Sequence, residues 1–181
     1  HYALLVAPGV ATTVLAWRAF AKVKELLGDE DPYRGFKEES RRVAESLASE
    51  VRRAAEGLLG FERLRYLLRA SVAANYLDPG SPMGVEPGDL LRVIEQVRFG
   101  RDETAQLYER LLVSRSVAYV LDNSGEAVFD ALVLEELARM GLRLHILARG
   151  KPYQNDVTYE EARQMGLDRL GELVSTGTDF P

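Results

Sequence analysis

Ser116-Val-Ala-Tyr-Val-Leu-Asp-Asn-Ser-Gly-Glu126 is the stretch that decides the fold of this 181-residue chain. Its apolar run ends in an acid, an amide, a glycine and a second acid, and a helical pattern of apolar residues follows at once. This order predicts a buried strand whose C-terminal end opens onto the N-terminus of a helix. Open α/β sheets bind their ligands at that edge, where unpaired helical N–H groups favour an anion.

The residues after this stretch repeat the pattern. The expected elements are a strand at 116–121, a helix at 127–140, a strand at 143–148, a loop at 149–158, a helix at 159–166 and a strand at 170–174. Thr158-Tyr-Glu-Glu161 is a capping box that opens the short helix. Strands that alternate with helices pair in parallel, so residues 113–181 are predicted to form a Rossmann-like core with a parallel sheet.

The residues before the first strand read as helices. Apolar residues at helical spacing predict a helix that begins near Val10 and further helices at 33–57, 61–77, 87–98 and 102–112, with a Pro- and Gly-rich loop at 79–84. The predicted fold class is therefore α/β. We expect residues 1–112 to form an all-helical region before the core, integrated with it into one structural unit.

The composition excludes several classes of function. With 46% apolar and 28% charged residues, the chain is typical of a soluble globular protein, and its net charge of −5 disfavours a nucleic-acid partner. The uncharged segment 2–17 is interrupted by Pro8-Gly9, is short for a membrane span and lacks a basic leader, so we expect no membrane association and a cytoplasmic location. With no Cys and two His, thiolate and histidine-ligated zinc sites are disfavoured.

The chain contains few Asn residues, and each lies close to an Asp in the sequence. Arg outnumbers Lys 19 to 4 and Asn occurs three times, a composition that fits a heat-adapted protein, although biased base composition gives the same skew. Asn75, Asn123 and Asn155 each have an Asp within three positions. The placement of Asn beside acids favours a functional role for these segments.

Asp122 and Asp156 follow successive predicted strands. Because the C-terminal ends of neighbouring parallel strands lie about 5 Å apart, we expect the two carboxylates to meet, where they repel unless a proton or cation is shared. A Mg²⁺ or Mn²⁺ ion on Asp122, Asn123 and Asp156 satisfies this requirement, with Co²⁺ or Ni²⁺ as alternatives. Mg²⁺ bound in this way takes a substrate phosphate, so we predict metal-assisted phosphoryl chemistry with Asp122 and Asp156 as the catalytic acids.

Each acidic motif also has a simpler interpretation. Asp122 and Asn123 can cap the helix that follows them, and Asn155 and Asp156 can form a plain turn. The sequence alone leaves both interpretations open for either pair, and the expected meeting of the two pairs at adjacent strand ends favours the functional one.

Further polar residues flank the predicted site. Arg149 and Lys151 border the second acidic loop and can contact phosphate oxygens, although such cations are more often plain surface residues. Thr176 follows the third predicted strand, where it can donate to phosphate or belong to a turn.

Five segments carry a resemblance to a known family. They are Asp-Pro-Tyr-Arg-Gly-Phe-Lys-Glu-Glu-Ser (31–40), Ala-Ala-Asn-Tyr-Leu-Asp (73–78), Leu-Asp-Asn-Ser-Gly-Glu-Ala-Val-Phe-Asp (121–130), Arg-Gly-Lys-Pro-Tyr-Gln-Asn-Asp-Val-Thr (149–158) and Ser-Thr-Gly-Thr-Asp-Phe-Pro (175–181). In this order they resemble the ARMT-like family of metal-dependent damage-control phosphatases, in its archaeal-type branch. The motifs Asp-Asn-x-Gly-Glu and Asn-Asp-x-Thr are specific as a pair, although neither is specific alone.

The resemblance implies an α/β core with an added helical region and a divalent ion on the two acids and the amide named above. It implies hydrolysis of phosphate monoesters, such as sugar phosphates or damaged phosphometabolites. It also implies that Glu126 contacts the substrate and that Asn75 lines the same cleft. We expect Asn155, which precedes the acid of the second motif, to bind substrate as well. Which acid activates the attacking water is left open by both lines of reasoning.

The chain departs from the family at both ends. In the family that the chain resembles, the segment that matches 175–181 is followed by a strand and a Lys-Gly motif whose lysine contacts phosphate. The Cys-x-Pro-Cys motif often found near their N-terminus has Val6-Ala-Pro-Gly9 as its nearest counterpart here. We therefore expect a trimmed fragment, a product of a split gene or a degenerate member. Its open sheet edge can pair with a second copy or with a partner chain.

Three functions remain in competition. The first is a metal-dependent phosphatase, and the second is a non-catalytic domain that binds metal and phosphometabolites. The third is a nucleotide-binding α/β module, which the absence of a Gly-rich first turn disfavours.

Overall fold

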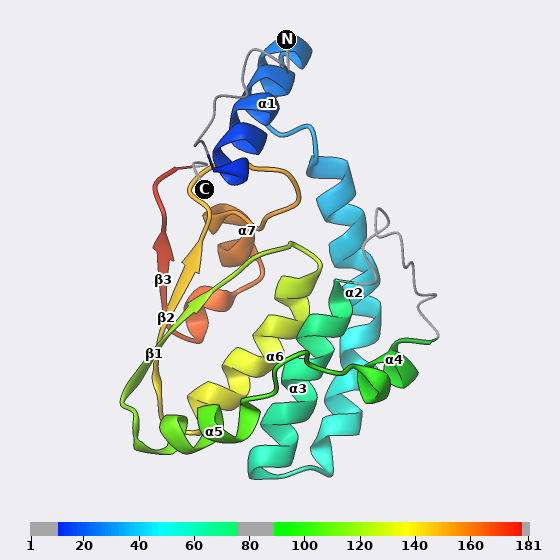
Figure 1. The fold of residues 1–181 in the computed structure, drawn as a ribbon, viewed down its shortest axis with the longest axis vertical. Coiled ribbons are helices and arrows are strands. Elements are labelled where there is room, and N and C mark those ends of the chain that lie inside the picture. The colour runs from blue at the N-terminus through cyan, green and yellow to red at the C-terminus, as the bar shows by residue number, and fades with distance from the viewer. Residues whose placement is uncertain (1–10, 76–88, 179–181) are drawn as a thin grey trace.

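The structure, a computed structural model, describes residues 11–75 and 89–178 (Figure 1). In order along the chain the elements are α1 (Thr12–Leu27), α2 (Arg34–Glu56), α3 (Gly60–Ala74), α4 (Leu90–Gln96), α5 (Thr104–Val113), β1 (Ser116–Val120), α6 (Glu126–Arg139), β2 (Arg143–Ala148), α7 (Tyr159–Gln164), the 3₁₀ helix η3 (Leu167–Arg169) and β3 (Glu172–Ser175). The expected α/β fold, with helices before a β-α-β-α-β core, is confirmed.

The sheet has the strand order β1-β2-β3, and both pairs are parallel, as predicted. Tyr119 is in register with Ile146, and Ile146 with Leu173. Along the central strand β2, alternate residues Leu144, Ile146 and Ala148 are buried, because successive side chains of a strand point to opposite faces. Parallel pairing places the C-terminal ends of all three strands at one edge of the sheet.

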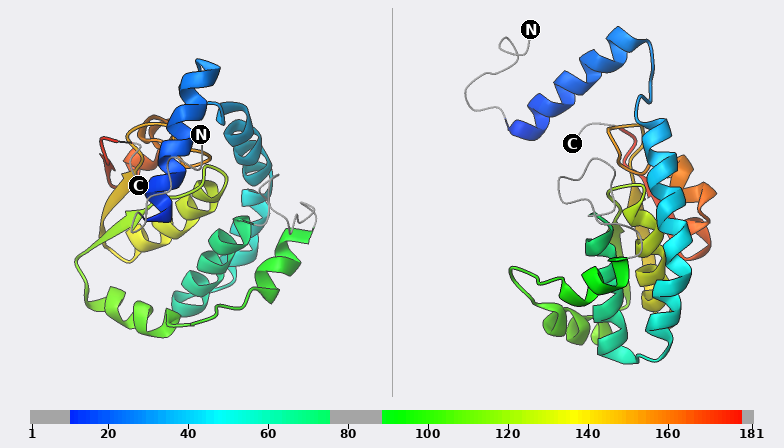
Figure 2. Two further views of the ribbon diagram at one scale, coloured as in Figure 1. Left: turned by 45° about the horizontal axis from the view of Figure 1, so that its top comes forward. Right: turned by 90° about the vertical axis from the view of Figure 1, so that its right-hand side faces the viewer.

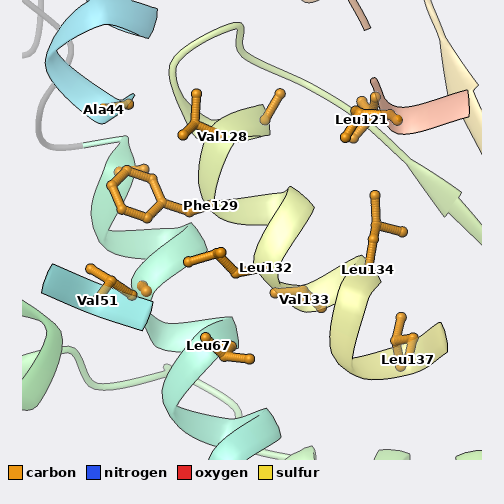
Figure 3. Close-up of a cluster of buried hydrophobic side chains, with 14 of the residues drawn as sticks. Ala44, Val51, Leu67, Leu121, Val128, Phe129, Leu132, Val133, Leu134 and Leu137 are labelled. Carbon is orange, nitrogen blue, oxygen red and sulfur yellow. The ribbon is translucent and has the colours of Figure 1, made fainter. Parts of the chain in front are cut away.

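Helix α6 forms the centre of the hydrophobic core. In Figure 1 it lies between the sheet and the helices α2 and α3, and it contacts β2, α2 and α3. Phe129 and Val133 of α6 are buried together with Val51 of α2 and Leu67 of α3 (Figure 3). This packing fixes the N-terminus of α6, and with it the loop that follows β1.

Helix α2 packs on α6 along one face, because its buried residues recur every three or four positions. They are Lys37, Ser40, Ala44, Leu47, Val51 and Ala55. Lys37 is an unusual member of this buried face, because a charged side chain is costly to bury without partners.

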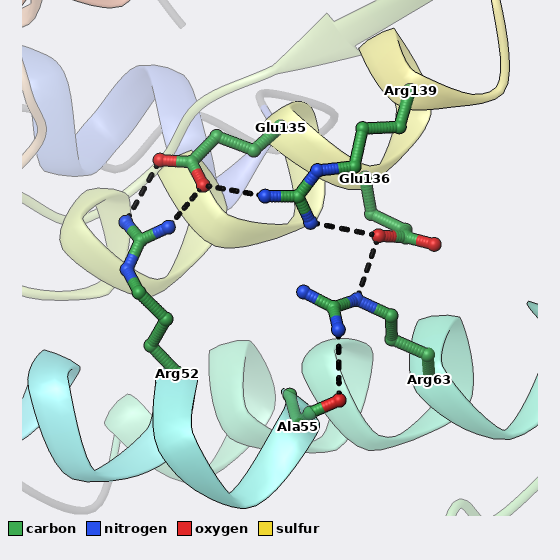
Figure 4. A network of polar contacts seen from close by, with 6 residues as sticks. All are labelled: Arg52, Ala55, Arg63, Glu135, Glu136 and Arg139. Atoms are coloured by element: carbon green, nitrogen blue, oxygen red, sulfur yellow. Dashed lines mark hydrogen bonds and ion pairs between the residues drawn. The ribbon is translucent and has the colours of Figure 1, made fainter. Parts of the chain in front are cut away.

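Ion pairs join the C-terminal parts of α2 and α6 and the N-terminal part of α3 (Figure 4). Arg52 of α2 pairs with Glu135 of α6, and Arg63 of α3 lies 2.8 Å from Glu136. Arg139 contacts both glutamates, and Arg63 also donates to the carbonyl oxygen of Ala55 at 2.9 Å. This network lies at the opposite end of α6 from the loop that follows β1, and it stabilises the packing of the helices.

The predicted elements occur with small shifts at their ends. The last strand begins at 172 instead of 170, because residues 167–169 form η3 before it. The short helix ends at Gln164 instead of 166, since Gly166 has a φ of 79°, a left-handed conformation that ends helices. The predictions for residues 1–10 and 76–88, which include the start near Val10 and the loop at 79–84, lie outside the described residues.

Helix α1 lies at one end of the molecule (Figure 2). Its Phe20 packs edge-to-face against Tyr33 and Tyr153, with ring centroids 5.8 and 5.4 Å apart. Through Tyr153 this helix contacts the loop that follows β2. Over residues 11–75 and 89–178, no helix has the length and apolar character needed to cross a membrane.

Candidate functional site

Two loops meet where β1 and β2 end. The N–H of Val157 donates to the carbonyl oxygen of Asp122 at 2.7 Å, and the N–H of Ser124 donates to that of Asn155 at 2.9 Å. These bonds accompany an isolated antiparallel bridge between Asn123 and Asp156. The two acidic segments, 34 residues apart in sequence, are therefore joined through their backbones.

A pocket of about 260 Å³ opens at this junction. Its polar lining residues are Asp122, Arg149, Asp156 and Thr176, and the remaining lining comes from the ends of β1 and β2. Asp122 is exposed, whereas Asp156 is only 7% exposed. The pocket thus combines two acids, a cation and a hydroxyl at the edge of the sheet.

Asp156 is held by the cation of its own loop. The Nε of Arg149 donates to Oδ2 of Asp156 at 2.6 Å, and the guanidinium lies 5.2 Å from the ring centroid of Tyr153. Burial raises the pKa of Asp156, the ion pair with Arg149 acts in the opposite direction, and the negative charge of Asp122 raises the pKa further. The two acids therefore interact electrostatically across the pocket.

Thr176 reaches the pocket from the end of β3. Its N–H donates to the carbonyl oxygen of Ala148 at 3.0 Å, which continues the pairing of β3 with β2. Its hydroxyl accepts from the N–H of Gly150 at 3.0 Å and donates to the carbonyl oxygen of Thr178 at 2.9 Å. Of the candidates in the second loop, Lys151 is exposed and does not line the pocket, and Asn155 contributes the carbonyl group described above.

A second polar cluster lies at the start of α6. The amide nitrogen of Asn123 donates to Oδ1 of Asn75 at 2.8 Å and to Oε2 of Glu126 at 3.5 Å. The amide nitrogen of Asn75 donates to the same Oε2 at 2.7 Å. Burial, followed by the charge of Asp130, raises the pKa of Glu126 to about 7, although the hydrogen bond from Asn75 opposes this. Three residues assigned to the site from the sequence are thus hydrogen-bonded to one another.

Of the two simpler interpretations of the acidic motifs, the structure supports the turn at Asp156 but not a helix cap at Asp122 and Asn123. The N-cap residue of helix α6 is Gly125, which has no side chain, so neither Asp122 nor Asn123 occupies the capping position. A turn does occur before Asp156, whose N–H donates to the carbonyl oxygen of Tyr153 at 3.1 Å, with Gln154 at a φ of 46°. This turn is also what brings the side chain of Asp156 into the lining of the pocket.

Sequence reasoning missed Asp130, one turn after Glu126 on α6. Asp130 is buried, and its Oδ1 accepts from the hydroxyls of Ser71 and Tyr119, each at 2.7 Å. Burial raises its pKa to about 6 although both hydroxyls lower it. An acid among the apolar residues Phe129, Leu132 and Val133 is the signal that could have identified it.

Replacing Asp130 by Asn is expected to flatten the pH dependence of stability. Because the pKa of the folded protein, about 6, exceeds the usual value, Asp130 stabilises the fold most below about pH 4, and this contribution is lost as the pH rises through about 6. Metal-free wild-type protein should therefore lose more unfolding free energy than the variant between about pH 4 and about pH 7. Urea unfolding of both proteins measures this, and equal losses would contradict the assignment.

The oxygen atoms at the junction suit a hard divalent cation. Asp122 and Asp156 supply carboxylates, and since the amide nitrogen of Asn123 is used in hydrogen bonds, its oxygen is the atom that can serve a cation. Within the described residues, no three His, Cys, Asp or Glu side chains are grouped closely enough to hold a metal ion. A cation here would thus rely on the two acids, the amide and water or substrate oxygens, a set that fits Mg²⁺.

Comparison with known proteins gives a consistent assignment. The sequence profile of the damage-control phosphatase ARMT1-like domain matches residues 5–181. A damage-control phosphatase of Pyrococcus horikoshii is 27% identical over 175 residues, which cover 94% of this chain and 57% of that protein. One of Archaeoglobus fulgidus is 31% identical over 168 residues, which cover 90% of this chain and 57% of that protein.

A solved structure agrees with these sequence matches. The crystal structure of a DUF89 family protein from Pyrococcus horikoshii superposes with a TM-score of 0.83 and 26% identity, covering 98% of this chain and 63% of that one. This chain spans little more than half the length of the curated relatives it matches. The match over nearly the whole chain nevertheless shows that the chain belongs to the damage-control phosphatase ARMT1-like domain family.

Proposed function

We propose that this chain carries the site of a divalent-metal-dependent phosphatase that hydrolyses phosphate monoesters of small metabolites, such as sugar phosphates or damaged phosphometabolites. The observation that carries the proposal is the content of one pocket, which places Asp122 and Asp156 beside Arg149 and Thr176. Paired acids suit a divalent cation, and a guanidinium with a hydroxyl suits phosphate oxygens. Family membership supports the same chemistry.

The residues of the pocket have distinct roles in this proposal. A divalent ion held by Asp122, Asn123 and Asp156 would supply Lewis-acid stabilisation of the charge on the transferred phosphoryl group. Arg149, already oriented by its bond to Asp156, donates to phosphate oxygens. The hydroxyl of Thr176, whose hydrogen is donated to the carbonyl oxygen of Thr178, would donate to a phosphate after exchanging that bond. One of the two acids, Asp122 or Asp156, is the candidate for accepting a proton from the attacking water.

The second polar cluster would bind the alcohol part of the substrate. Asn75, Asn123 and Glu126 present amide and carboxyl groups next to the acidic junction, and they already fix one another by hydrogen bonds. Groups held in this way recognise hydroxyls with little loss of side-chain entropy on binding. Hydroxyl-rich esters, such as sugar phosphates, match this cluster better than apolar ones.

A second candidate function is metal and phosphometabolite binding without turnover. One observation favours it: among the described residues that line the pocket Arg149 is the one cation, and its Nε is already bonded to Asp156. A single, partly engaged cation can bind a phosphate without giving the charge stabilisation that its transfer needs.

The experiment is phosphate release from a panel of phosphate esters by metal-free protein supplied with Mn²⁺, Mg²⁺, Co²⁺, Ni²⁺ or EDTA. We expect turnover with Mn²⁺ or Mg²⁺, no turnover with EDTA, and a preference for hydroxyl-rich esters. No turnover with any cation, combined with calorimetric binding of Mn²⁺ and a sugar phosphate, would contradict the phosphatase proposal and support the second candidate. Turnover that persists in EDTA would contradict the dependence on metal.

A further inference from the structure

Lys37 is the most deeply buried charged residue of the described chain, with 1% of its surface exposed. Its Nζ lies 2.9 Å from Oδ2 of Asp31, which precedes α2, and 2.8 Å from Oε1 of Glu161 on α7. A buried ammonium group is tolerated only when it is paired in this manner. The ion pair with Glu161 therefore ties the start of α2 to the segment that follows β2.

Glu161 is also hydrogen-bonded to Thr158. Its Oε2 accepts from the backbone N–H of Thr158 at 2.7 Å and from the hydroxyl at 2.8 Å, and the hydroxyl in turn accepts from the N–H of Glu161 at 3.3 Å. Burial alone would raise the pKa of Glu161, but Lys37 and the N–H of Thr158 lower it below the usual value. Glu161 is therefore a charged acceptor for both partners.

Thr158 lies two residues after Asp156, and the residues before and after it are both hydrogen-bonded to the backbone of Arg149. The N–H of Arg149 donates to the carbonyl oxygen of Val157 at 3.2 Å, and the N–H of Tyr159 donates to that of Arg149 at 2.7 Å. The position of the segment 156–159 thus determines where Arg149 and Asp156, which form an ion pair, lie relative to each other. A change at Thr158 must alter how Asp156 enters the pocket.

We propose that Lys37 is a positioning residue for Asp156, which acts through Glu161 and Thr158 to hold the segment 156–159 against the end of β2. Lys37 does not line the pocket, and the ion pair with Glu161 and the bonds from Glu161 to Thr158 connect it to the segment that does. This role deepens the proposed function and rests on it for the catalytic consequence. The effect on the segment itself can be measured without any activity.

The test compares Lys37→Met with a matched control, Glu136→Gln, which breaks the Arg63–Glu136 ion pair between helices away from the pocket. Hydrogen exchange by mass spectrometry follows the amides of 156–159 and those of α3 in metal-free protein. We expect Lys37→Met to accelerate exchange in 156–159 about tenfold more than in α3, and Glu136→Gln to show no such selectivity. Lys37→Arg, which keeps the charge, should restore most of the protection.

The catalytic readout is the kcat for a phosphate ester at saturating Mn²⁺, together with KM. We expect Lys37→Met to lower kcat by about tenfold or more, as residues that orient a ligating side chain do, with a smaller change in KM. If Lys37→Met does not fold, Glu161→Gln decides, because it keeps an acceptor for Thr158 and loses only the charge that faces Lys37. It should reproduce the selective exchange.

Uniform acceleration of exchange across 156–159 and α3, or an unchanged kcat in a folded Lys37→Met protein that is otherwise active, would overturn the positioning role. Inactive wild-type protein would instead count against the proposed function. In that case the exchange comparison still decides whether Lys37 holds the segment, so the two failures are distinguishable.

Discussion

Replacing Asp122 by Asn is expected to reduce metal-dependent phosphate release by roughly a thousandfold, which corresponds to about 4 kcal/mol of transition-state stabilisation. Asp122 is exposed at the mouth of the pocket, and Asn has the same shape without the charge. The variant should therefore fold normally and lose affinity for the divalent ion. Initial rates at several Mn²⁺ concentrations, together with circular dichroism, measure both effects.

The matched control for this variant is Asp168→Asn, which removes the charge of another exposed acid, on η3. Its phosphate release should stay within about twofold of wild type, because surface charges away from a site have small effects. If Asp122→Asn retained wild-type turnover and metal affinity, Asp122 would have no part in the mechanism.

Replacing Phe129 by Ala is expected to cost about 3–5 kcal/mol of unfolding free energy. Phe129 has no exposed surface and contributes to the packing of α6 on α2 and α3 (Figure 3), so its removal leaves a cavity at the centre of the core. In a domain of this size the loss corresponds to a decrease in Tm of about 10 °C. Urea and thermal unfolding followed by circular dichroism provide the measurement.

Leu26→Ala is the control for this loss of apolar surface. Leu26 is 73% exposed on α1, so its truncation should change the unfolding free energy by less than about 0.5 kcal/mol. Equal effects of the two substitutions would show that α6 does not form the centre of the core.

The strand ends were predictable from sequence because their signals are local. The apolar run before Asp122 ends abruptly in polar residues, and the next strand stands about one βαβ unit later, so parallel pairing alone brings the two acidic loops together. The capping box at Thr158 has an equally local signature and is present in the structure. Such features depend only on neighbours within a few residues or on the regular geometry of a sheet.

Other contacts were not predictable because they depend on how distant elements pack. In the sequence Lys37 is one of many charged residues of α2, and its partner Glu161 comes from the distant helix α7. Asp130 is likewise one of several acids of α6, and its donors Ser71 and Tyr119 come from α3 and β1. The pattern does contain a hint, since both residues occupy positions that helical spacing assigns to the buried face. Identifying their partners requires the relative placement of the helices and the sheet.

The measurement that tests the central claim most directly is anomalous diffraction from crystals of this protein soaked in Mn²⁺. The claim is that Asp122, Asn123 and Asp156 together hold a divalent ion at the ends of β1 and β2. We predict one strong anomalous peak between the oxygen atoms of these three residues, and no such peak in crystals of the Asp122→Asn variant. A Mn²⁺ peak elsewhere on the protein with none at this junction would contradict the claim.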